Sequence, residues 1–197
     1  MPKHPENSFT DAVAKVYDSV LVPLLFEPYA RDLAARVVAI APHSLLEVAC
    51  GTGAVTRVLA ESLPASCAIT ATDLSGPMVA YAQSVGTRRS ITWHQADAMA
   101  LPFDDASFDA VVCQFGAMFF PDRVAGFREA RRVLRNSGTF LFNVWSRIEE
   151  NELALVLSEA LNLRYPNEPV EFLARVPHGY GSIRQIEADV RAAGFTQ

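Results

Sequence analysis

Short apolar runs alternate along the chain with segments in which apolar residues recur every three or four positions. The runs predict strands near residues 44–49, 67–72, 90–95, 109–115 and 138–145. The spaced segments predict helices near residues 53–63, 76–85 and 121–135. The last helix should turn one stripe to the core, formed by Val124, Phe127, Ala130 and Leu134. This alternation indicates an α/β fold with a parallel sheet and helices on both faces.

Helical patterns also flank this region. The N-terminal part predicts a helix over about residues 8–22, broken near Pro23, and a second over about residues 29–41. The C-terminal part predicts a helix over residues 182–193. Residues 146–182 contain no interpretable motif.

A glycine-rich turn follows the first predicted strand. Gly51 and Gly53 lie between that strand and the helix that begins near Val55. Glycine lets a ligand approach the main chain closely, and a helix start adds unpaired N–H groups. Asp73 ends the next strand, roughly 20 residues after Gly53, where a Rossmann-like unit places a carboxylate on ribose hydroxyls. The turn therefore indicates a nucleotide-type ligand.

Two residues disfavour a dinucleotide as that ligand. The third small residue of the dinucleotide fingerprint G-x-G-x-x-G/A would fall at Thr56. Glu47 lies just before the turn, where it would repel a pyrophosphate and attract an ammonium group. The ligand is therefore better described as a nucleoside that carries an amine, and S-adenosylmethionine fits that description.

Five segments in this order resemble the class I S-adenosylmethionine-dependent methyltransferases, in particular the type 11 small-molecule branch. They are residues 45–53, 71–78, 95–103, 107–112 and 127–138. Ala49 stands where many members of the branch have a further glycine. The resemblance implies a Rossmann-like, doubly wound, mostly parallel sheet over residues 44–197. Residues 1–43 would form a helical lid.

The resemblance also implies which residues bind S-adenosyl-L-methionine and its product S-adenosyl-L-homocysteine. They are Tyr17, Glu47, Ala49, Gly51, Gly53, Asp73, Leu74, Met78, Asp97, Ala98, Gln114 and Phe115. Glu47 would accept from the methionyl ammonium, Asp73 from the ribose, and Asp97 from the adenine amine, with the Ala98 N–H on the ring. Tyr17 would belong to the lid.

Each of these assignments has a structural alternative. Glu47 could be a surface carboxylate, and Asp97 could cap a turn. Leu74, Met78, Phe115 and Tyr17 could be ordinary core residues. Phe119 and Phe120 could shape the acceptor pocket or pack on the following helix. His178 and Tyr180 lie in a glycine-bearing loop of the acceptor region, although a lone loop histidine is more often at the surface.

Composition is ordinary for a globular protein, with 50% hydrophobic and 20% charged residues and a formal net charge of −5. No cluster of Lys and Arg resembles a nucleic-acid footprint, and no apolar run is long enough to cross a bilayer. Cys50, Cys67 and Cys113 have no metal-ligand spacing. We therefore expect a cytoplasmic protein with buried thiols and no metal, nucleic-acid or membrane partner.

The C-terminal region departs from the family pattern. The resemblance implies strands six and seven after the last helix, but the sequence ends at Gln197. The fifth strand would then be an apolar sheet edge, which favours pairing with another chain. We expect either a truncated sequence or a homodimer that covers this edge.

The resulting expectation is an enzyme that moves a methyl group from S-adenosylmethionine to a small acceptor by in-line displacement. No catalytic residue is named, because positioning supplies much of such a reaction. The aromatic residues Phe26, Tyr29, Phe115, Phe119 and Phe120 favour an apolar or aromatic acceptor. The alternatives are a non-catalytic or degenerate cofactor-binding protein and, less favoured, an NAD(P)-dependent oxidoreductase.

Overall fold

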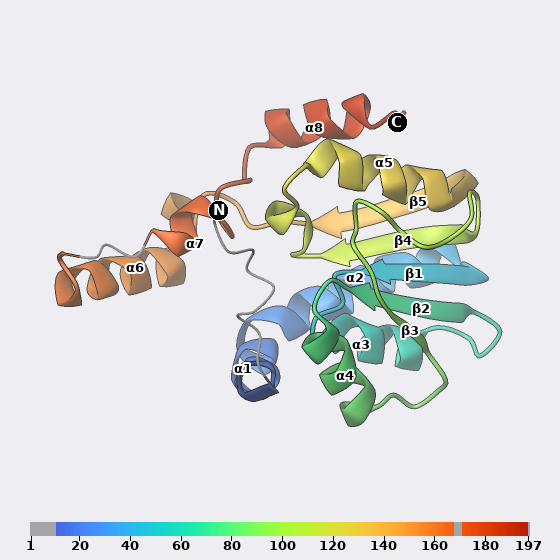
Figure 1. Cartoon of the computed structure of the whole chain (residues 1–197), viewed down its shortest axis with the longest axis horizontal. Coiled ribbons are helices and arrows are strands. Elements are labelled where there is room, and N and C mark those ends of the chain that lie inside the picture. The colour runs from blue at the N-terminus through green and yellow to red at the C-terminus, as the bar shows by residue number, and fades with distance from the viewer. Residues whose placement is uncertain (1–10, 168–170, 197) are drawn as a thin grey trace.

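The computed structural model describes residues 11–167 and 171–196 (Figure 1). Its strands are β1 (Ser44–Val48), β2 (Ala68–Asp73), β3 (Thr92–Gln95), β4 (Phe108–Gln114) and β5 (Leu134–Asn143). The α-helices are α1 (Asp11–Val16), α2 (Glu27–Ile40), α3 (Ala54–Ser62), α4 (Gly76–Val85), α5 (Arg123–Val133), α6 (Glu152–Arg164), α7 (Phe172–Arg175) and α8 (Ile183–Ala192). A π-helix, η2 (Tyr17–Phe26), joins α1 to α2, and η3 (Ala117–Phe119) and η4 (Ile148–Glu150) are short 3₁₀ helices.

The five strands form one sheet in the order β3-β2-β1-β4-β5, and all four neighbouring pairs are parallel. The sequence therefore predicted the α/β class, the parallel sheet and all five strands correctly. Strand order reverses between β1 and β4. In open α/β sheets ligands bind beyond the carboxyl ends of the strands at such a reversal.

Alternate residues of β1 turn to opposite faces of the sheet. Leu45 packs with α2 and α3 in one buried cluster, and Leu46 packs with α5 in the other. This two-residue period sends Glu47 to the same side as Leu45, towards α3. The alternation along β1 therefore places the Glu47 carboxylate against α3, on the face that α2 and α3 cover.

The predicted break near Pro23 is wrong. The chain stays helical from Asp11 to Ile40, because a π-helix carries Pro23. The Glu27 N–H bonds to the Val22 carbonyl, five residues earlier, and this wider turn accommodates the proline ring. Residues 8–10 of the predicted first helix lie outside the described residues.

Strand β5 begins earlier than predicted, because α5 ends at Val133 and the strand starts at once with Leu134. Leu134 pairs with Phe108, and regular pairing resumes with Ala110 and Thr139, so the extra residues form a bulge. Leu134 is buried as predicted, but from the strand and not from the helix.

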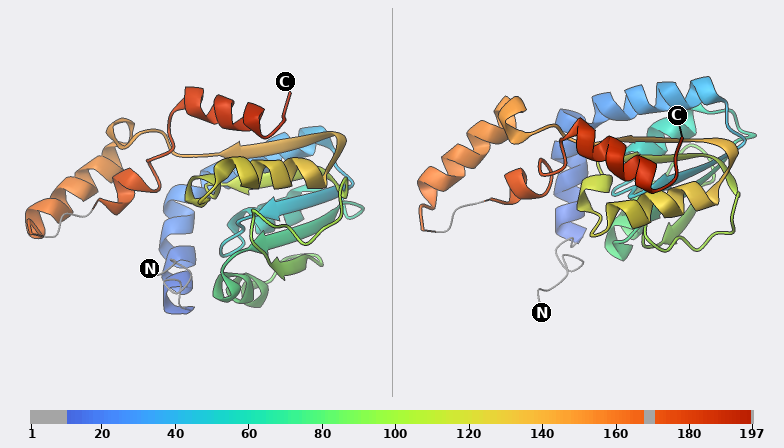
Figure 2. Two further views of the ribbon diagram at one scale, coloured as in Figure 1. Left: turned by 45° about the horizontal axis from the view of Figure 1, so that its top comes forward. Right: turned by 90° about the horizontal axis from the view of Figure 1, so that it is seen from above.

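Helix α8 packs beside α5, as Figures 1 and 2 show. In the segment after α8, the Phe195 ring stacks on Phe140 of β5, with 5.6 Å between ring centroids. β5 is the last strand of the sheet among the described residues, and its side chains from Thr139 to Asn143 are only partly exposed. Helices α6 and α7 lie beyond the carboxyl end of β5, away from the sheet (Figures 1 and 2).

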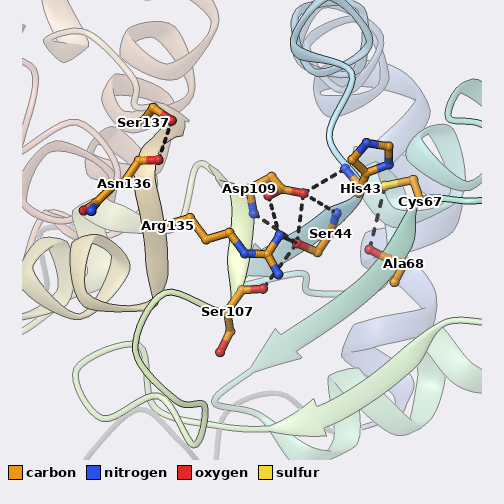
Figure 3. A network of polar contacts seen from close by, with 9 residues as sticks. All are labelled: His43, Ser44, Cys67, Ala68, Ser107, Asp109, Arg135, Asn136 and Ser137. Carbon is orange, nitrogen blue, oxygen red and sulfur yellow. Dashed lines mark hydrogen bonds and ion pairs between the residues drawn. The ribbon is translucent and has the colours of Figure 1, made fainter.

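A polar network fixes the amino ends of β1, β4 and β5 (Figure 3). The Asp109 carboxylate accepts bonds from the His43 and Ser44 N–H groups, both 2.9 Å, and from the Ser44 hydroxyl at 3.1 Å. Arg135, from the β5 bulge, donates to the other Asp109 oxygen. Burial raises the pKa of Asp109, but these donors outweigh it and lower the pKa below its ordinary value. The network therefore lies at the amino ends of the strands, opposite to the carboxyl ends where the ligand site is expected.

Candidate active site

A small cavity of about 40 Å³ lies at the carboxyl ends of β1 and β4. It is lined by residues of the glycine turn, the N-terminal helix and the end of β4, namely Tyr17, Val22, Phe26, Glu47, Ala49, Cys50, Gly51, Thr52, Ala54, Val55 and Gln114. The structure therefore brings five of the predicted binding residues to one cavity: Tyr17, Glu47, Ala49, Gly51 and Gln114.

The turn after β1 uses left-handed backbone at three alternate residues, Ala49 (φ 57°), Gly51 (φ 55°) and Gly53 (φ 82°). Glycine adopts this conformation at little cost, whereas alanine is strained there. The alanine at position 49 therefore occupies a conformation suited to the glycine that many family members have. A Cβ on Gly51 would meet no atom within 4 Å, so the main chain is open to a ligand at this point.

Glu47 is a buried carboxyl and not a surface one, with 2% of its area exposed. It accepts a 2.6 Å hydrogen bond from the hydroxyl of Thr56, the residue that replaces the small residue of the dinucleotide fingerprint. Burial raises the pKa of Glu47 to about 8, and the Asp73 charge adds to the rise, while Thr56 and Arg57 oppose it. An incoming ammonium group would supply the countercharge that this buried carboxyl lacks.

Asp73 holds the glycine turn in place. Its carboxylate accepts 2.8 Å bonds from the N–H groups of Gly51 and Ser75. Burial raises the Asp73 pKa, and the two N–H bonds oppose the rise. Each oxygen retains acceptor capacity for a ligand hydroxyl.

Tyr17 covers the site from the N-terminal helix. Its ring stacks on Phe26, with 5.1 Å between centroids. Burial, followed by the charge of Asp73, raises the pKa of the Tyr17 hydroxyl well above its ordinary value. Tyr17 therefore lies within electrostatic reach of the predicted ribose carboxylate, as a lid residue should.

Asp97 and Ala98 lie in the loop after β3, which starts beside Asp73, because the Ala96 N–H bonds to the Asp73 carbonyl at 2.9 Å. One Asp97 oxygen accepts a 2.8 Å bond from the Met99 N–H, which is the turn-capping alternative. The other Asp97 oxygen has acceptor capacity remaining. Neither residue lines the small cavity.

Leu74 and Met78, predicted to form one apolar wall, have different surroundings. The Leu74 side chain is 47% exposed, whereas Met78 is 4% exposed. Met78 therefore fits its core alternative, and Leu74 is available at the surface beside Asp73. Gly53 is buried, and a Cβ there would lie 3.1 Å from Ala82 and 3.3 Å from Trp93. Its small size is needed for packing as well as for the turn.

Gln114 ends β4, and Phe115 follows it in an aromatic cluster. The Phe115 ring stacks on Trp145 at 4.0 Å, and Phe26 and Tyr29 contact both rings. The Gln114 amide donates to the Phe26 carbonyl at 3.3 Å, which ties the N-terminal helix to β4. Phe119 is 50% exposed, whereas Phe120 packs against Gly126 of α5.

His178 and Tyr180 are both buried, so the surface alternative for His178 is wrong. The His178 Nδ1 lies 2.8 Å from the Ser146 carbonyl oxygen, and Tyr180 donates to Asp189 at 2.7 Å. Arg123 lies over the Tyr180 ring at 4.3 Å. These contacts hold the loop against α5, α8 and the segment that follows β5, and neither residue lines the small cavity.

Sequence reasoning missed Thr52 and Arg57. The Thr52 hydroxyl and the side-chain amide oxygen of Gln114 (Oε1) are buried and have no hydrogen-bond partner among the described residues. Both residues line the cavity. Arg57 donates to the nearby Thr52 carbonyl and to Asp18. Asp18 lies 39 positions away in the sequence, too far for local pattern to reveal the pair. The unpaired polar atoms fit a polar ligand, and the methionyl end of S-adenosylmethionine, expected from the sequence, is such a ligand.

Comparison with known proteins identifies the family of this chain. Residues 46–142 match a family model described as a methyltransferase domain. A demethylmenaquinone methyltransferase of Mycobacterium sp. (strain JLS) is 34% identical over 206 residues, which cover 98% of this chain and 86% of the relative. The chain belongs to the class I S-adenosylmethionine-dependent methyltransferases.

Other members of this methyltransferase family match over a shorter length. The demethylmenaquinone methyltransferase of Deinococcus radiodurans is 40% identical over 110 residues, which cover 55% of this chain and 45% of the relative. The chain spans about half the length of several such relatives, from 45% to 59% in four of them. A Methanococcus maripaludis protein assigned to the S-adenosylmethionine-dependent methyltransferases has the same fold, with a TM-score of 0.72 and 20% identity. That match covers 95% of this chain and 86% of the other.

Membership of the methyltransferase family argues against the oxidoreductase alternative. Within residues 11–167 and 171–196, no helix is long and apolar enough to cross a membrane. The same residues contain no group of three or more His, Cys, Asp or Glu that could hold a metal ion. All three cysteines are buried and free, as the sequence predicted.

Proposed function

We propose that this chain binds S-adenosylmethionine at the carboxyl ends of β1, β2 and β4 and transfers its methyl group to a small-molecule acceptor. The observation that carries the proposal is the buried Glu47 carboxyl, which faces a cavity with the unpaired polar atoms of Thr52 and Gln114. An ammonium and a carboxylate would find partners here, whereas a dinucleotide pyrophosphate would meet no basic side chain among the residues that line the cavity.

Each part of the cofactor has residues suited to it. Glu47 would accept from the methionyl ammonium, and the Thr52 hydroxyl would donate to the methionyl carboxylate. Asp73 would accept from the ribose hydroxyls while it holds the Gly51 and Ser75 N–H groups. Asp97 and Ala98 would bind the adenine edge, with Leu74 beside its face. The bound cofactor supplies a methyl group activated by its sulfonium.

The chain's own contribution is positioning. No catalytic nucleophile is needed for an electrophile of this kind, and alignment for in-line displacement can contribute about 7–11 kcal/mol in ideal cases. The present cavity of about 40 Å³ is far smaller than the roughly 300 Å³ or more of typical ligand sites. Tyr17, Val22 and Phe26 of the N-terminal segment line this cavity. The proposal therefore includes a movement of that segment that admits the cofactor and, on its return, excludes water.

The acceptor is proposed to be an apolar ring compound. Support comes from the aromatic cluster of Phe26, Tyr29, Phe115 and Trp145 beside the cavity, and from relatives named demethylmenaquinone methyltransferases. A demethylated quinol is therefore the first acceptor to test. The test incubates the chain with methyl-labelled S-adenosylmethionine and follows the label into product by mass spectrometry, with a primary amine and a simple phenol as comparison acceptors.

Label in the quinol product alone would support the proposal. Binding of S-adenosylhomocysteine without transfer to any acceptor would favour the second candidate, a non-catalytic cofactor-binding protein. A homodimer across the β5 edge stays part of the proposal, since β5 is the last strand of the sheet among the described residues. Sedimentation of the purified chain as a monomer would contradict the homodimer. The proposed setting is the cytoplasm.

A further inference from the structure

Two side chains of α5, Glu129 and Arg132, face the loop that leads from β3 to β4. They belong to the segment 127–138, which helped to mark the family and to which the proposed function assigns no role. The loop contains Asp97 and Ala98, the residues proposed for the adenine edge. Both α5 side chains are largely shielded, with 20% of Glu129 and 30% of Arg132 exposed.

The Arg132 guanidinium spans the main chain of this loop. Its Nη2 donates to the Leu101 carbonyl at 2.9 Å, and its Nη1 donates to the Phe103 carbonyl at 2.8 Å. Nη1 also bonds to Asp105 at 2.8 Å, but that carboxylate is 79% exposed and contributes less. The planar, five-donor fork of arginine suits this multiple contact, which an ammonium group could not reproduce.

Glu129 holds Arg132 in place, and we call this pair of side chains the clamp. Its carboxylate holds Arg132 through two bonds, at 2.8 and 2.9 Å, and accepts a 2.9 Å bond from the Leu101 N–H. The Arg132 bonds lower the pKa of Glu129, and Glu129 raises that of Arg132. Leu101 therefore has both its N–H and its carbonyl bound to one ion pair, and its side chain is 5% exposed in the core.

The other end of the loop is bonded to β2 at Asp73, the residue proposed for the ribose hydroxyls. The Ala96 N–H bonds to the Asp73 carbonyl, and the Ala100 N–H closes a turn onto the Asp97 carbonyl at 3.0 Å. Residues 97–100 therefore span two fixed points, Asp73 on β2 and Leu101 under the clamp. A displacement at Leu101 would move Asp97 directly, because only three residues lie between them.

We propose that Glu129 and Arg132 are positioning residues for base recognition, which hold the β3–β4 loop so that Asp97 and Ala98 meet the adenine edge. This inference rests on the proposed function. It gives α5 a role in recognition of the adenine base, although α5 carries none of the residues proposed to contact the ligand. A site built to hydrogen-bond a ligand group discriminates against a ligand without that group, and it does so only while its polar atoms are held in place.

The test measures discrimination between two ligands by calorimetry. One is S-adenosylhomocysteine, and the other is the same compound with a purine that lacks the 6-amino group. The full chain is compared with Glu129→Gln, Arg132→Lys and Asp97→Ala. The matched control is Arg135→Gln. Arg135 is three residues further along, in β5, and also bonds to a carboxylate, but it does so at the amino ends of the strands, away from the proposed site.

We expect the unaltered chain and Arg135→Gln to prefer S-adenosylhomocysteine about tenfold or more. In Asp97→Ala, Glu129→Gln and Arg132→Lys the preference should fall to less than threefold, because binding of the adenine compound weakens and that of the deaminated one does not. A role in stability alone would lower the melting temperature and weaken both ligands equally.

Three results would overturn the inference. Full discrimination retained in both clamp variants would remove the positioning role, and full discrimination in Asp97→Ala would remove the loop from the base site. Failure of the unaltered chain to bind either ligand would refute the proposed function together with the inference. If Arg132→Lys does not fold, Glu129→Gln decides, because glutamine keeps the shape of the side chain.

Discussion

Arg57 joins Asp18 of the N-terminal helix to the glycine turn. Its Nη2 lies 2.6 Å from Asp18 Oδ1, and its Nη1 lies 2.7 Å from the Thr52 carbonyl oxygen. The pair is shielded from solvent, with 25% of Arg57 and 16% of Asp18 exposed. The same helix carries Tyr17, Val22 and Phe26 over the cavity. This contact, which we call the latch, therefore joins the N-terminal helix to the glycine turn. In the proposed function that helix is the lid of the site.

Breaking the latch with Asp18→Asn should speed the movement of the cofactor in both directions. A partly buried, charge-assisted bond contributes about 1–3 kcal/mol, so we expect the association and dissociation rate constants of S-adenosylhomocysteine to rise several-fold or more. The dissociation constant should change less than either rate. Stopped-flow tryptophan fluorescence measures both rates, because Trp93 lies next to Gly53.

The matched control for the latch is Asp32→Asn. It breaks the Arg36–Asp32 pair of α2, in which both side chains are more than 60% exposed, and it should leave both rates unchanged. An association rate in Asp18→Asn equal to that of the unaltered chain would show that the latch does not control entry.

Glu47 should make cofactor affinity depend on pH. Its pKa is raised to about 8, so the carboxyl is mostly protonated at pH 6 in the free protein. An ammonium ligand prefers the ionised form, and affinity should therefore rise between pH 6 and 7, where an α-amino group is still mostly protonated. Calorimetry at several pH values should show this rise in the unaltered chain and a weaker, flat affinity in Glu47→Gln. A rise of equal slope in Glu47→Gln would assign the titration to another group.

The same raised pKa has a consequence for stability. In the unfolded chain Glu47 ionises at its ordinary pKa, so between pH 5 and 8 the unfolded state binds fewer protons than the folded one. The free energy of unfolding should therefore fall as pH rises through this window. Glu47→Gln should lose this part of the dependence in urea titrations, and an unchanged dependence would contradict the buried, protonated state.

Asp109 should stabilise the fold without affecting the ligand. Asp109→Asn weakens its bonds to Ser44, His43 and Arg135 and should lower the free energy of unfolding by about 1–3 kcal/mol, with unchanged affinity for S-adenosylhomocysteine. The pKa of Asp109 is lowered, so this contribution is present above pH 4 and disappears as pH falls below it. Thermal melts at pH 7 and pH 3 compare the two chains. A stability difference that persists undiminished at pH 3, or a loss of ligand affinity, would be inconsistent with this role.

Local pattern was sufficient for much of the fold. Short apolar runs located all five strands, and helical spacing located the helices between them, because buried strands and core-facing helices each leave such a pattern. The glycine turn and Asp73 were predicted from their spacing. The structure added a reason for that spacing, because Asp73 bonds directly to the turn at Gly51.

What sequence reasoning missed depends on contacts between distant segments. The helix continues through Pro23 because a π-helical turn accommodates the proline ring, and the local preference of proline to end a helix does not predict that turn. The latch joins residues 39 positions apart, and the clamp joins α5 to a loop about as distant. Charged residues carry no periodic signal, so the partners of Arg57 and Arg132 became visible only in three dimensions.

The measurement that tests the central claim most directly is a calorimetric titration of the purified chain with S-adenosylhomocysteine and, separately, with NADH. We predict micromolar binding of the former and none of the latter. Asp73→Ala should weaken that binding by about 1–3 kcal/mol, because ribose hydroxyls lose an acceptor. Binding of NADH, failure to bind S-adenosylhomocysteine, or unchanged affinity in Asp73→Ala would contradict the assignment of this site.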